Sequence, residues 1–365
     1  MFAMSRTLSV LTKFCYAKLA DYGLLRYARN DKKIIVQRKW TQVIASECLS
    51  CHCEPQATRH CEPQAKQSCE IKELFMNNLN FGIIGLGIMG GSIARSIREN
   101  ILNEKSSSGK IYAFDINQTS LDLAKNENII DQGFSKDDVK NMLQLCDVVF
   151  ICLYPKKTIE FLKENKENFK SGSVITDISG VKSIYNNMEE VFPTNADFVL
   201  GHPMAGGEKE GFANSNGNYF INHNYIIIPQ ARNKPESIKL MENLITAMKF
   251  SRITKTDCKT HDEKIGFTSQ LCHVVASAMV ESAEDSSITS FGGGSFEDLT
   301  RIAMINAPLW TELFLSNKVA LLKHIKSFIS KMHEFESLIQ NEDAQQLEDL
   351  LKDVRKKRIE MNELR

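Results

Sequence analysis

Two residues at the predicted ends of strands are the best suited in this chain to move a proton. Ser179 follows an apolar run that ends at Asp177, and His202 follows an apolar run that ends at Leu200. Histidine is the usual group that accepts a proton near neutral pH. If a hydride leaves an alcohol carbon, the hydroxyl proton needs such an acceptor. We therefore expect His202 to accept that proton and Ser179 to orient His202.

A glycine-rich turn supplies the cofactor site that a hydride transfer requires. Residues 80–91 read NFGIIGLGIMGG, an apolar run followed by three spaced glycines and the apolar start of a helix. The first glycine permits the tight strand-to-helix turn, the second lets a pyrophosphate approach the backbone, and the third lets the helix pack close to the strand. The helix N-terminus then attracts the phosphates. The predicted cofactor contacts are Gly85, Leu86, Gly87, Ile88, Met89 and Gly90.

An acidic residue beyond the next strand indicates which dinucleotide binds. Asp115 ends the run Ile111–Phe114, where a carboxylate hydrogen-bonds the adenosine ribose and repels a 2′-phosphate. No arginine follows it directly, so the sequence favours NAD over NADP. Asp115 could also cap the next helix, and both roles can coexist. Tyr154 and Pro155 end another buried run, and we expect them to line the cofactor site as well.

Strand and helix patterns alternate through residues 76–256, which predicts an α/β domain with a Rossmann-type doubly wound parallel sheet. Residues 257–365 lack strand signals and show amphipathic helical patterns, including helix-start signals at Thr260 and Ser295. We expect an all-helical substrate and dimerisation domain there. The predicted strands are residues 80–84, 111–114, 147–153, 173–177, 197–200 and 225–228.

Composition limits the partners of the chain. Its 365 residues carry 45 basic and 45 acidic side chains, so nothing in the balance suggests nucleic acid. No apolar run is long enough to predict a membrane span. The cysteines after residue 75 are dispersed, which suits packing thiols in a reducing cytoplasm. We expect a cytoplasmic protein that forms a homodimer through its helical domain.

The first 75 residues differ from the rest. They hold 12 basic against 7 acidic residues and six of the ten cysteines, and HCEPQA occurs twice, at 52–57 and 60–65. The spacing does not match paired metal ligands, so we predict no metal site. The first twenty residues are acid-free, as in a transit peptide. A disordered low-complexity extension and a reading frame that truly starts at Met76 are the other two interpretations, and we favour the start at Met76.

Five ordered motifs make the chain similar to the prephenate dehydrogenase (TyrA) family. They span from about Met76 to the C-terminus, and the third and fifth motifs are far more diagnostic than the glycine turn. The motifs are Gly85-x-Gly87-x-x-Gly90, Asp177-x-Ser179-x-Val181-Lys182, His202-Pro203-Met204-Ala205-Gly206, His261-Asp262 and Asp298-Leu299-Thr300-Arg301-Ile302-Ala303.

The resemblance implies NAD-dependent oxidative decarboxylation of prephenate to 4-hydroxyphenylpyruvate, a step in tyrosine biosynthesis. It assigns His202 as acceptor from the ring hydroxyl and Ser179 as a bridge between that histidine and the nicotinamide. Arg301 would hold a substrate carboxylate, which suits a planar bidentate donor. His273, His261 and Gly207 complete the substrate-binding residues that it implies.

Some residues depart from the family pattern. The Ser-His-x-Pro-His segment reads Ser-Gln-Leu-Cys-His here, so only His273 remains, and Gly207 stands where threonine is common. Arogenate therefore stays open as a second substrate. The sequence also leaves open a related 3-hydroxy acid dehydrogenase, with Lys264 as its catalytic candidate, and a non-catalytic NAD-sensing module.

Overall fold

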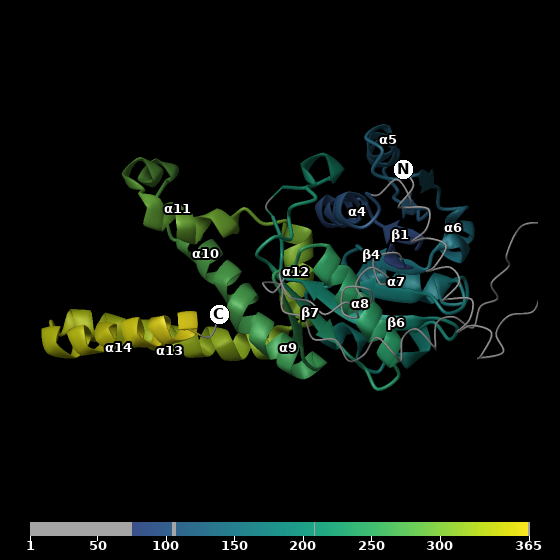
Figure 1. Ribbon diagram of the computed structural model, residues 1–365. Helices are drawn as coiled ribbons and strands as arrows, with labels where there is room; N and C mark the ends of the chain where they lie inside the picture. The colour runs from purple at the N-terminus through teal and green to yellow at the C-terminus, as the bar shows by residue number, and fades with distance from the viewer. Residues whose placement is uncertain (1–74, 104–106, 208, 364–365) are drawn as a thin grey trace, which may run out of the picture. The chain divides into compact units, whose positions relative to one another are not determined.

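The computed structural model describes residues 75–103, 107–207 and 209–363. Within these residues an eight-stranded sheet has the order β3-β2-β1-β4-β5-β6-β7-β8 (Figure 1). The order of the first six strands in the sheet is that of a dinucleotide-binding Rossmann fold. The strands are β1 (Phe81–Ile84), β2 (Ile111–Phe114), β3 (Gln132–Phe134), β4 (Val148–Ile151), β5 (Val174–Asp177), β6 (Asp197–Pro203), β7 (Asn224–Ile228) and β8 (Arg252–Lys255).

The sheet confirms the doubly wound α/β prediction, with one difference. All neighbouring strands pair in parallel except β6 and β7, which are antiparallel and place His202 opposite Ile226. Strands β3 and β8 were not predicted. The first has three residues, and the second has only half-buried and exposed side chains at a sheet edge, so neither gives a strong apolar signal.

Both faces of the sheet are covered, which explains the continuous apolar runs. In β1, Phe81 and Ile83 join one core cluster while Ile84 joins the other, because successive strand residues point to opposite faces. The first cluster includes side chains of α4 (Ile88–Asn100), α5 (Gln118–Asn126) and α8 (Pro235–Ala247), and the second those of α6 (Val139–Leu145) and α7 (Pro155–Asn165).

The residues after β8 are helical in the described part of the chain, as predicted. Helix α9 leads through a π-helical turn, η5, directly into α10, and α13 and α14 lie side by side (Figure 1). The elements are α9 (Cys258–Ile265), η5 (Gly266–Leu271), α10 (Cys272–Glu281), η6 (Ser286–Phe291), α11 (Gly294–Thr300), η7 (Arg301–Ala303), α12 (Ala307–Ser316), α13 (Lys318–Gln340) and α14 (Ala344–Glu363).

The two predicted helix starts are wrong by a few residues. Asp257 caps α9 and accepts a hydrogen bond from the amide of Thr260, because an aspartate three positions earlier takes the role that we gave to Thr260. Gly293, not Ser295, precedes α11. Short 3-10 turns η2 (Ser183–Tyr185), η3 (Glu189–Val191) and η4 (Phe212–Asn214) connect the strands.

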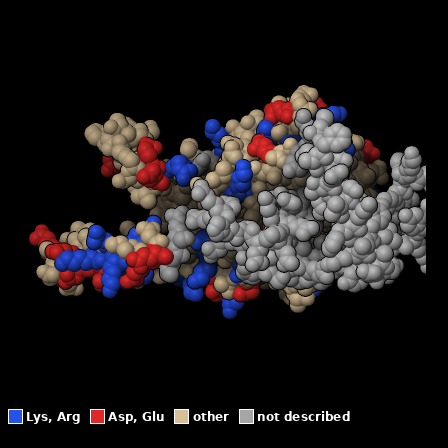
Figure 2. Space-filling view, in the orientation of Figure 1, with Lys and Arg blue, Asp and Glu red and all other residues tan. Residues whose placement is uncertain are grey.

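The surface of the α13–α14 hairpin carries interspersed positive and negative side chains (Figure 2). Several form ion pairs within one helix, such as Lys331 with Glu334 and Lys352 with Glu348. Pairs of this kind are typical of a solvated helix face. Among the described residues, none of the helices combines the length and apolar character that crossing a bilayer requires. The N-terminal extension that we predicted over residues 1–75 lies, apart from Phe75, outside the described part of the chain.

Candidate active site

The glycine turn has the three properties that a dinucleotide site needs. Gly85 has φ +92°, and a Cβ there would lie 2.8 Å from the carbonyl oxygen of Cys152. A Cβ on Gly90 would overlap the carbonyl oxygen of Gly85, so α4 packs directly on the turn. Gly87 has open space around its Cβ position, where a pyrophosphate can reach the backbone. Leu86 lies buried between these glycines, and Ile88 and Met89 begin α4.

Asp115 lies beside this turn, at the end of β2. Its carboxylate accepts hydrogen bonds from the amides of Leu86 (2.5 Å) and Asn117 (2.7 Å). The cap of α5 is Asn117, which accepts from the amides of Thr119 and Ser120, so Asp115 is not the helix cap. The carboxylate is thus fixed at the edge of the glycine turn, where a ribose would be recognised.

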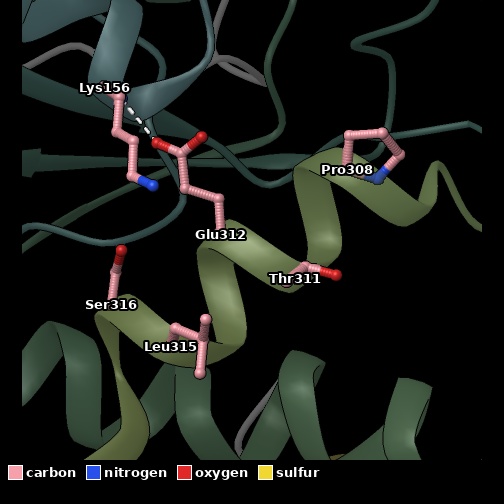
Figure 3. A pocket seen from close by; sticks show the side chains of 6 residues that line it. All are labelled: Lys156, Pro308, Thr311, Glu312, Leu315 and Ser316. Atoms are coloured by element: carbon pink, nitrogen blue, oxygen red, sulfur yellow. Dashed lines mark hydrogen bonds between the residues drawn. The ribbon is translucent and has the colours of Figure 1, made fainter.

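The predicted cofactor residues Tyr154 and Pro155 begin α7 and lie beside helix α12. Asn306 donates a hydrogen bond to the Tyr154 hydroxyl (2.8 Å), and the Lys156 amide donates to Glu312 (2.5 Å). Figure 3 shows this second bond beside a small pocket lined by α12. The turn after β4 is therefore tied to the helical part of the molecule. Pro155 occupies the first helical turn and is buried.

A buried ion pair joins the ends of β5 and β6. Lys182 and Asp177 have no exposed side-chain surface, and the ammonium group lies 2.7 and 2.8 Å from the two carboxylate oxygens. The same ammonium donates to the carbonyl oxygen of Gly201 (2.6 Å), next to His202. Burial lowers the pKa of Lys182, and Asp177 opposes that shift. Tyr185 also donates to Asp177 (2.8 Å), and burial raises the pKa of its hydroxyl well above 10.

His202 lies on β6 with its ring against a second histidine. Its Nδ1 is 2.9 Å from Nε2 of His261, whose Nδ1 is 2.7 Å from the carboxylate of Asp262. Ser179 is buried in the turn after β5. Its hydroxyl lies 3.5 Å from that of Tyr185, and the side chain hydrogen-bonded to His202 is that of His261. His261 was predicted to contact substrate, but it is 1% exposed and lies behind His202.

The environment keeps His202 neutral. Burial lowers its pKa well below 6.5, and the nearby His261 and Lys182 act in the same direction. A neutral imidazole can accept a proton, whereas an imidazolium cannot. The Nε2 atom of His202 faces the turn after β5, since a Cβ built on Gly180 would lie 3.7 Å from it. Gly180 therefore presents no side chain to this nitrogen.

The predicted substrate residues His273 and Arg301 come from neighbouring elements. His273 on α10 has its Nδ1 2.9 Å from the carbonyl oxygen of Ile302, the residue after Arg301. Its ring packs against Trp310 of α12 with 3.6 Å between ring centroids. One turn further along α12, Leu313 lies beside the Cβ position of Gly180. Helix α12 thus contacts His273 through Trp310 and reaches the turn beside His202 through Leu313.

Gly207 lies against the glycine turn and a tyrosine. A Cβ on Gly207 would overlap the Tyr219 hydroxyl and would lie 3.4 Å from Cδ1 of Ile88. The hydroxyl of Tyr219 therefore occupies the space that a side chain at position 207 would fill.

Gly207→Ala is expected to displace the Tyr219 hydroxyl and to lower the free energy of unfolding by about 1 kcal/mol, the lower end of the usual cost of overpacking, because position 207 is exposed. Gly206→Ala is the matched control, because nothing lies within 4 Å of its Cβ position. Thermal unfolding of both variants measures the difference. Equal melting temperatures for the two variants would show that Tyr219 moves aside without cost.

Several residues of this site carry no clear signal in the sequence. Asp262 and Lys182 belong to the recognised motifs but received no role, because their contacts join segments about 80 residues apart. Neither Trp310 nor Asn306 lies in a sequence motif that predicts a site. In the described part of the chain, no three His, Cys, Asp or Glu side chains are grouped so that they could hold a metal ion.

Two family models match the chain over consecutive segments. The model described as "Prephenate dehydrogenase, nucleotide-binding domain" matches residues 93–253, and the model described as "Prephenate dehydrogenase, dimerization domain" matches residues 257–353. The first segment contains most of the sheet, including His202, and the second contains His261, His273 and Arg301.

Known proteins are similar over most of the chain. A prephenate dehydrogenase of Lactococcus lactis is 29% identical over 282 residues, which cover 75% of each chain. A cyclohexadienyl dehydrogenase of Zymomonas mobilis is 26% identical over 77% of this chain and 95% of its own length. The crystal structure of prephenate dehydrogenase from A. aeolicus in complex with hydroxyphenyl propionate and NAD+ is 30% identical, with a TM-score of 0.69, and the match covers 78% of this chain and 98% of that chain.

Proposed function

Because the chain belongs to the prephenate dehydrogenase family, we propose that it uses NAD to convert prephenate to 4-hydroxyphenylpyruvate, a precursor of tyrosine. The observation that carries the proposal is the half-buried His202, whose pKa is lowered, at the carboxyl end of the sheet that bears the glycine turn. Ligands of doubly wound sheets bind at this end of the strands.

The residues around the glycine turn fit NAD. The open space at Gly87 suits a pyrophosphate, and the fixed carboxylate of Asp115 suits ribose hydroxyls and opposes a 2′-phosphate. Tyr154 and Pro155 stand at the end of β4, on the same edge of the sheet. When bound, NAD takes the hydride from the carbinol carbon of the substrate.

His202 supplies the proton acceptor of the reaction. Its Nε2 accepts the proton of the ring hydroxyl while the ring carboxylate leaves as CO2, and the ring becomes aromatic. Burial favours the neutral form that this step needs, since it lowers the pKa of His202. Ser179 lies in the adjoining turn and is proposed to bridge His202 and the nicotinamide.

Arg301 and His273 are proposed to hold the anionic part of the substrate. Arg301 lies on η7, directly before the residue whose carbonyl oxygen is bonded to His273. A guanidinium group binds a carboxylate through two parallel hydrogen bonds, so it can fix the substrate in position as well as attract it.

Arg301→Ala is expected to raise KM for the substrate by about tenfold to a hundredfold, because a hydrogen bond to a charged group contributes about 1.5–3 kcal/mol. The Kd for NAD should stay near that of the unaltered protein. Arg355→Ala, at an exposed position of α14, is the control. Steady-state kinetics and NAD titration measure both values, and an unchanged KM would exclude this role for Arg301.

Arogenate is a second candidate substrate. Gly207 and Cys272 depart from the common family residues, and the relatives include a cyclohexadienyl dehydrogenase. The deciding experiment incubates the protein with NAD and either prephenate or arogenate and follows NADH absorbance. The faster substrate identifies the activity. An absence of NADH with both would contradict the proposed function.

We propose that the protein forms a homodimer through its helical part. The matching family model is that of a dimerization domain, and many large apolar side chains between α10 and α14 are exposed in one chain, which marks an interaction surface. Sedimentation analysis should give the mass of two chains. The exposed apolar residues include Met279, Leu299, Met304, Val319, Leu322 and Met332.

We propose residues 76–256 as the NAD-binding domain and residues 257–365 as the substrate and dimerisation domain. A cytoplasmic location is also proposed, and the free thiols of all four cysteines among the described residues support it. Limited proteolysis tests the boundary near residue 256, and cell fractionation tests the location.

A further inference from the structure

A row of hydrogen bonds lies behind His202. Nδ1 of His202 is 2.9 Å from Nε2 of His261, and Nδ1 of His261 is 2.7 Å from Oδ1 of Asp262. The carboxylate of Asp262 also accepts hydrogen bonds from the amides of Lys182 (2.8 Å) and Ser183 (2.7 Å). All these groups are buried or half-buried, so the row is fixed by the fold rather than by solvent.

The row has one consistent arrangement of protons. Burial favours the neutral acid of Asp262, but hydrogen bonds from His261 and from the amides of Ser183 and Lys182 outweigh it and lower its pKa. A carboxylate can only accept, so Nδ1 of His261 carries a proton. Burial lowers the pKa of His261, which is therefore neutral and has an accepting Nε2. Nδ1 of His202 must then be the donor.

We propose that His261 and Asp262 are positioning residues that hold His202 as the Nδ1–H tautomer, with the Nε2 lone pair facing the substrate. The proposal rests on the proposed function, because it explains how His202 accepts the hydroxyl proton. The Nε2 atom faces the Gly180 turn, away from His261. In the other tautomer, Nε2 would carry a proton and could not accept one.

The row also accommodates the charge that the reaction creates. The substrate O–H bond breaks and an N–H bond forms at Nε2 of His202, while the hydride with its electron pair passes from the carbinol carbon to NAD, and the carboxylate leaves as CO2. His202 is then an imidazolium that still donates to His261. His261 donates in turn to the negative Asp262, so the new positive charge is balanced through two hydrogen bonds.

The first test observes the tautomer directly in the whole protein. NMR of protein labelled with 15N-histidine distinguishes protonated from unprotonated ring nitrogens. We expect the signals of His202 and His261 to show protonated Nδ1 and unprotonated Nε2 at neutral pH, with His202→Asn used to assign the first set. A protonated Nε2 on His202 would overturn the proposal, whether or not the protein turns over prephenate.

The second test uses two replacements of His261. A glutamine can accept from His202 and donate to Asp262, whereas a leucine can do neither. We expect His261→Leu to lower kcat about a hundredfold or more, with KM and NAD binding nearly unchanged. The kcat of His261→Gln should be at least about tenfold higher than that of His261→Leu.

The control is Lys259→Leu, an exposed position on the same helix, which should behave as the unaltered protein. The 15N signals of His202 should move in His261→Leu and stay in place in His261→Gln. Equal kcat values for the two His261 variants, or an unmoved His202 signal in His261→Leu, would show a merely structural role. If the unaltered protein makes no NADH, the proposed function fails, while the NMR result still decides the tautomer.

Discussion

His202→Asn is expected to lower kcat by about a hundredfold to ten-thousandfold, the usual contribution of a general base. Asparagine can keep a hydrogen bond to His261, but it cannot accept the proton of the substrate hydroxyl. The glycine turn and Asp115 lie on other strands, so the Kd for NAD should change little. Single-turnover kinetics and NAD titration measure the two effects.

The control for His202→Asn is His333→Asn, an exposed histidine on α13. An equal loss of NAD affinity in His202→Asn would contradict the assigned role. The pH profile gives an independent check. Because burial lowers the pKa of His202 well below 6.5, kcat/KM should stay level as the pH falls through 6.5 and decline only in more acidic solution. A midpoint at or above pH 6.5 would mean that His202 is not the titrating acceptor.

Lys182→Met is expected to lower the free energy of unfolding by about 3–5 kcal/mol, because it leaves the carboxylate of Asp177 buried without its counter-ion. The loss should also reduce kcat, since the ammonium group holds the carbonyl oxygen of Gly201 next to His202. Urea denaturation followed by circular dichroism measures the stability.

The matched control is Lys170→Met, which removes a half-exposed ion pair with Asp147 and should cost less than about 1 kcal/mol. Similar losses in the two variants would mean that the buried pair contributes no more than an ordinary surface pair. If kcat stays normal in Lys182→Met, the ion pair stabilises the fold but is not needed to position His202.

Much of the sheet could be predicted because its central strands have a recognisable sequence pattern. In β1 and β4, side chains pack against core on both faces, which requires an unbroken apolar run. Strand β8 has one partner and a half-exposed face, so its Arg-Ile-Thr-Lys sequence resembles a loop. The antiparallel pairing of β6 with β7 has no local signal, since strand direction depends on where the connecting segment returns.

The site could be predicted in part for a similar reason. Gly85 and Gly90 are required by contacts within one turn, so their spacing is visible in the sequence. The partner of His202 is not visible there, because His261 lies 59 positions away and reaches it through folding. The sequence therefore predicts His202 as the proton acceptor and Ser179, from a neighbouring strand end, as its neighbour, but it gives no sign of the hydrogen bond to His261.

The π-helical turn η5 determines where the two halves of the site face. A π-helical turn holds more residues than an α-helical turn, so every side chain after it is rotated from the direction that a regular helix would give. His261 precedes this turn and meets β6, and His273 follows it and meets Ile302 and Trp310. Loss of one residue between Gly266 and Leu271 would leave His261 beside His202 and turn His273 away from Ile302 and Trp310. The irregular turn thus sets the two different directions in which one continuous helix presents His261 and His273.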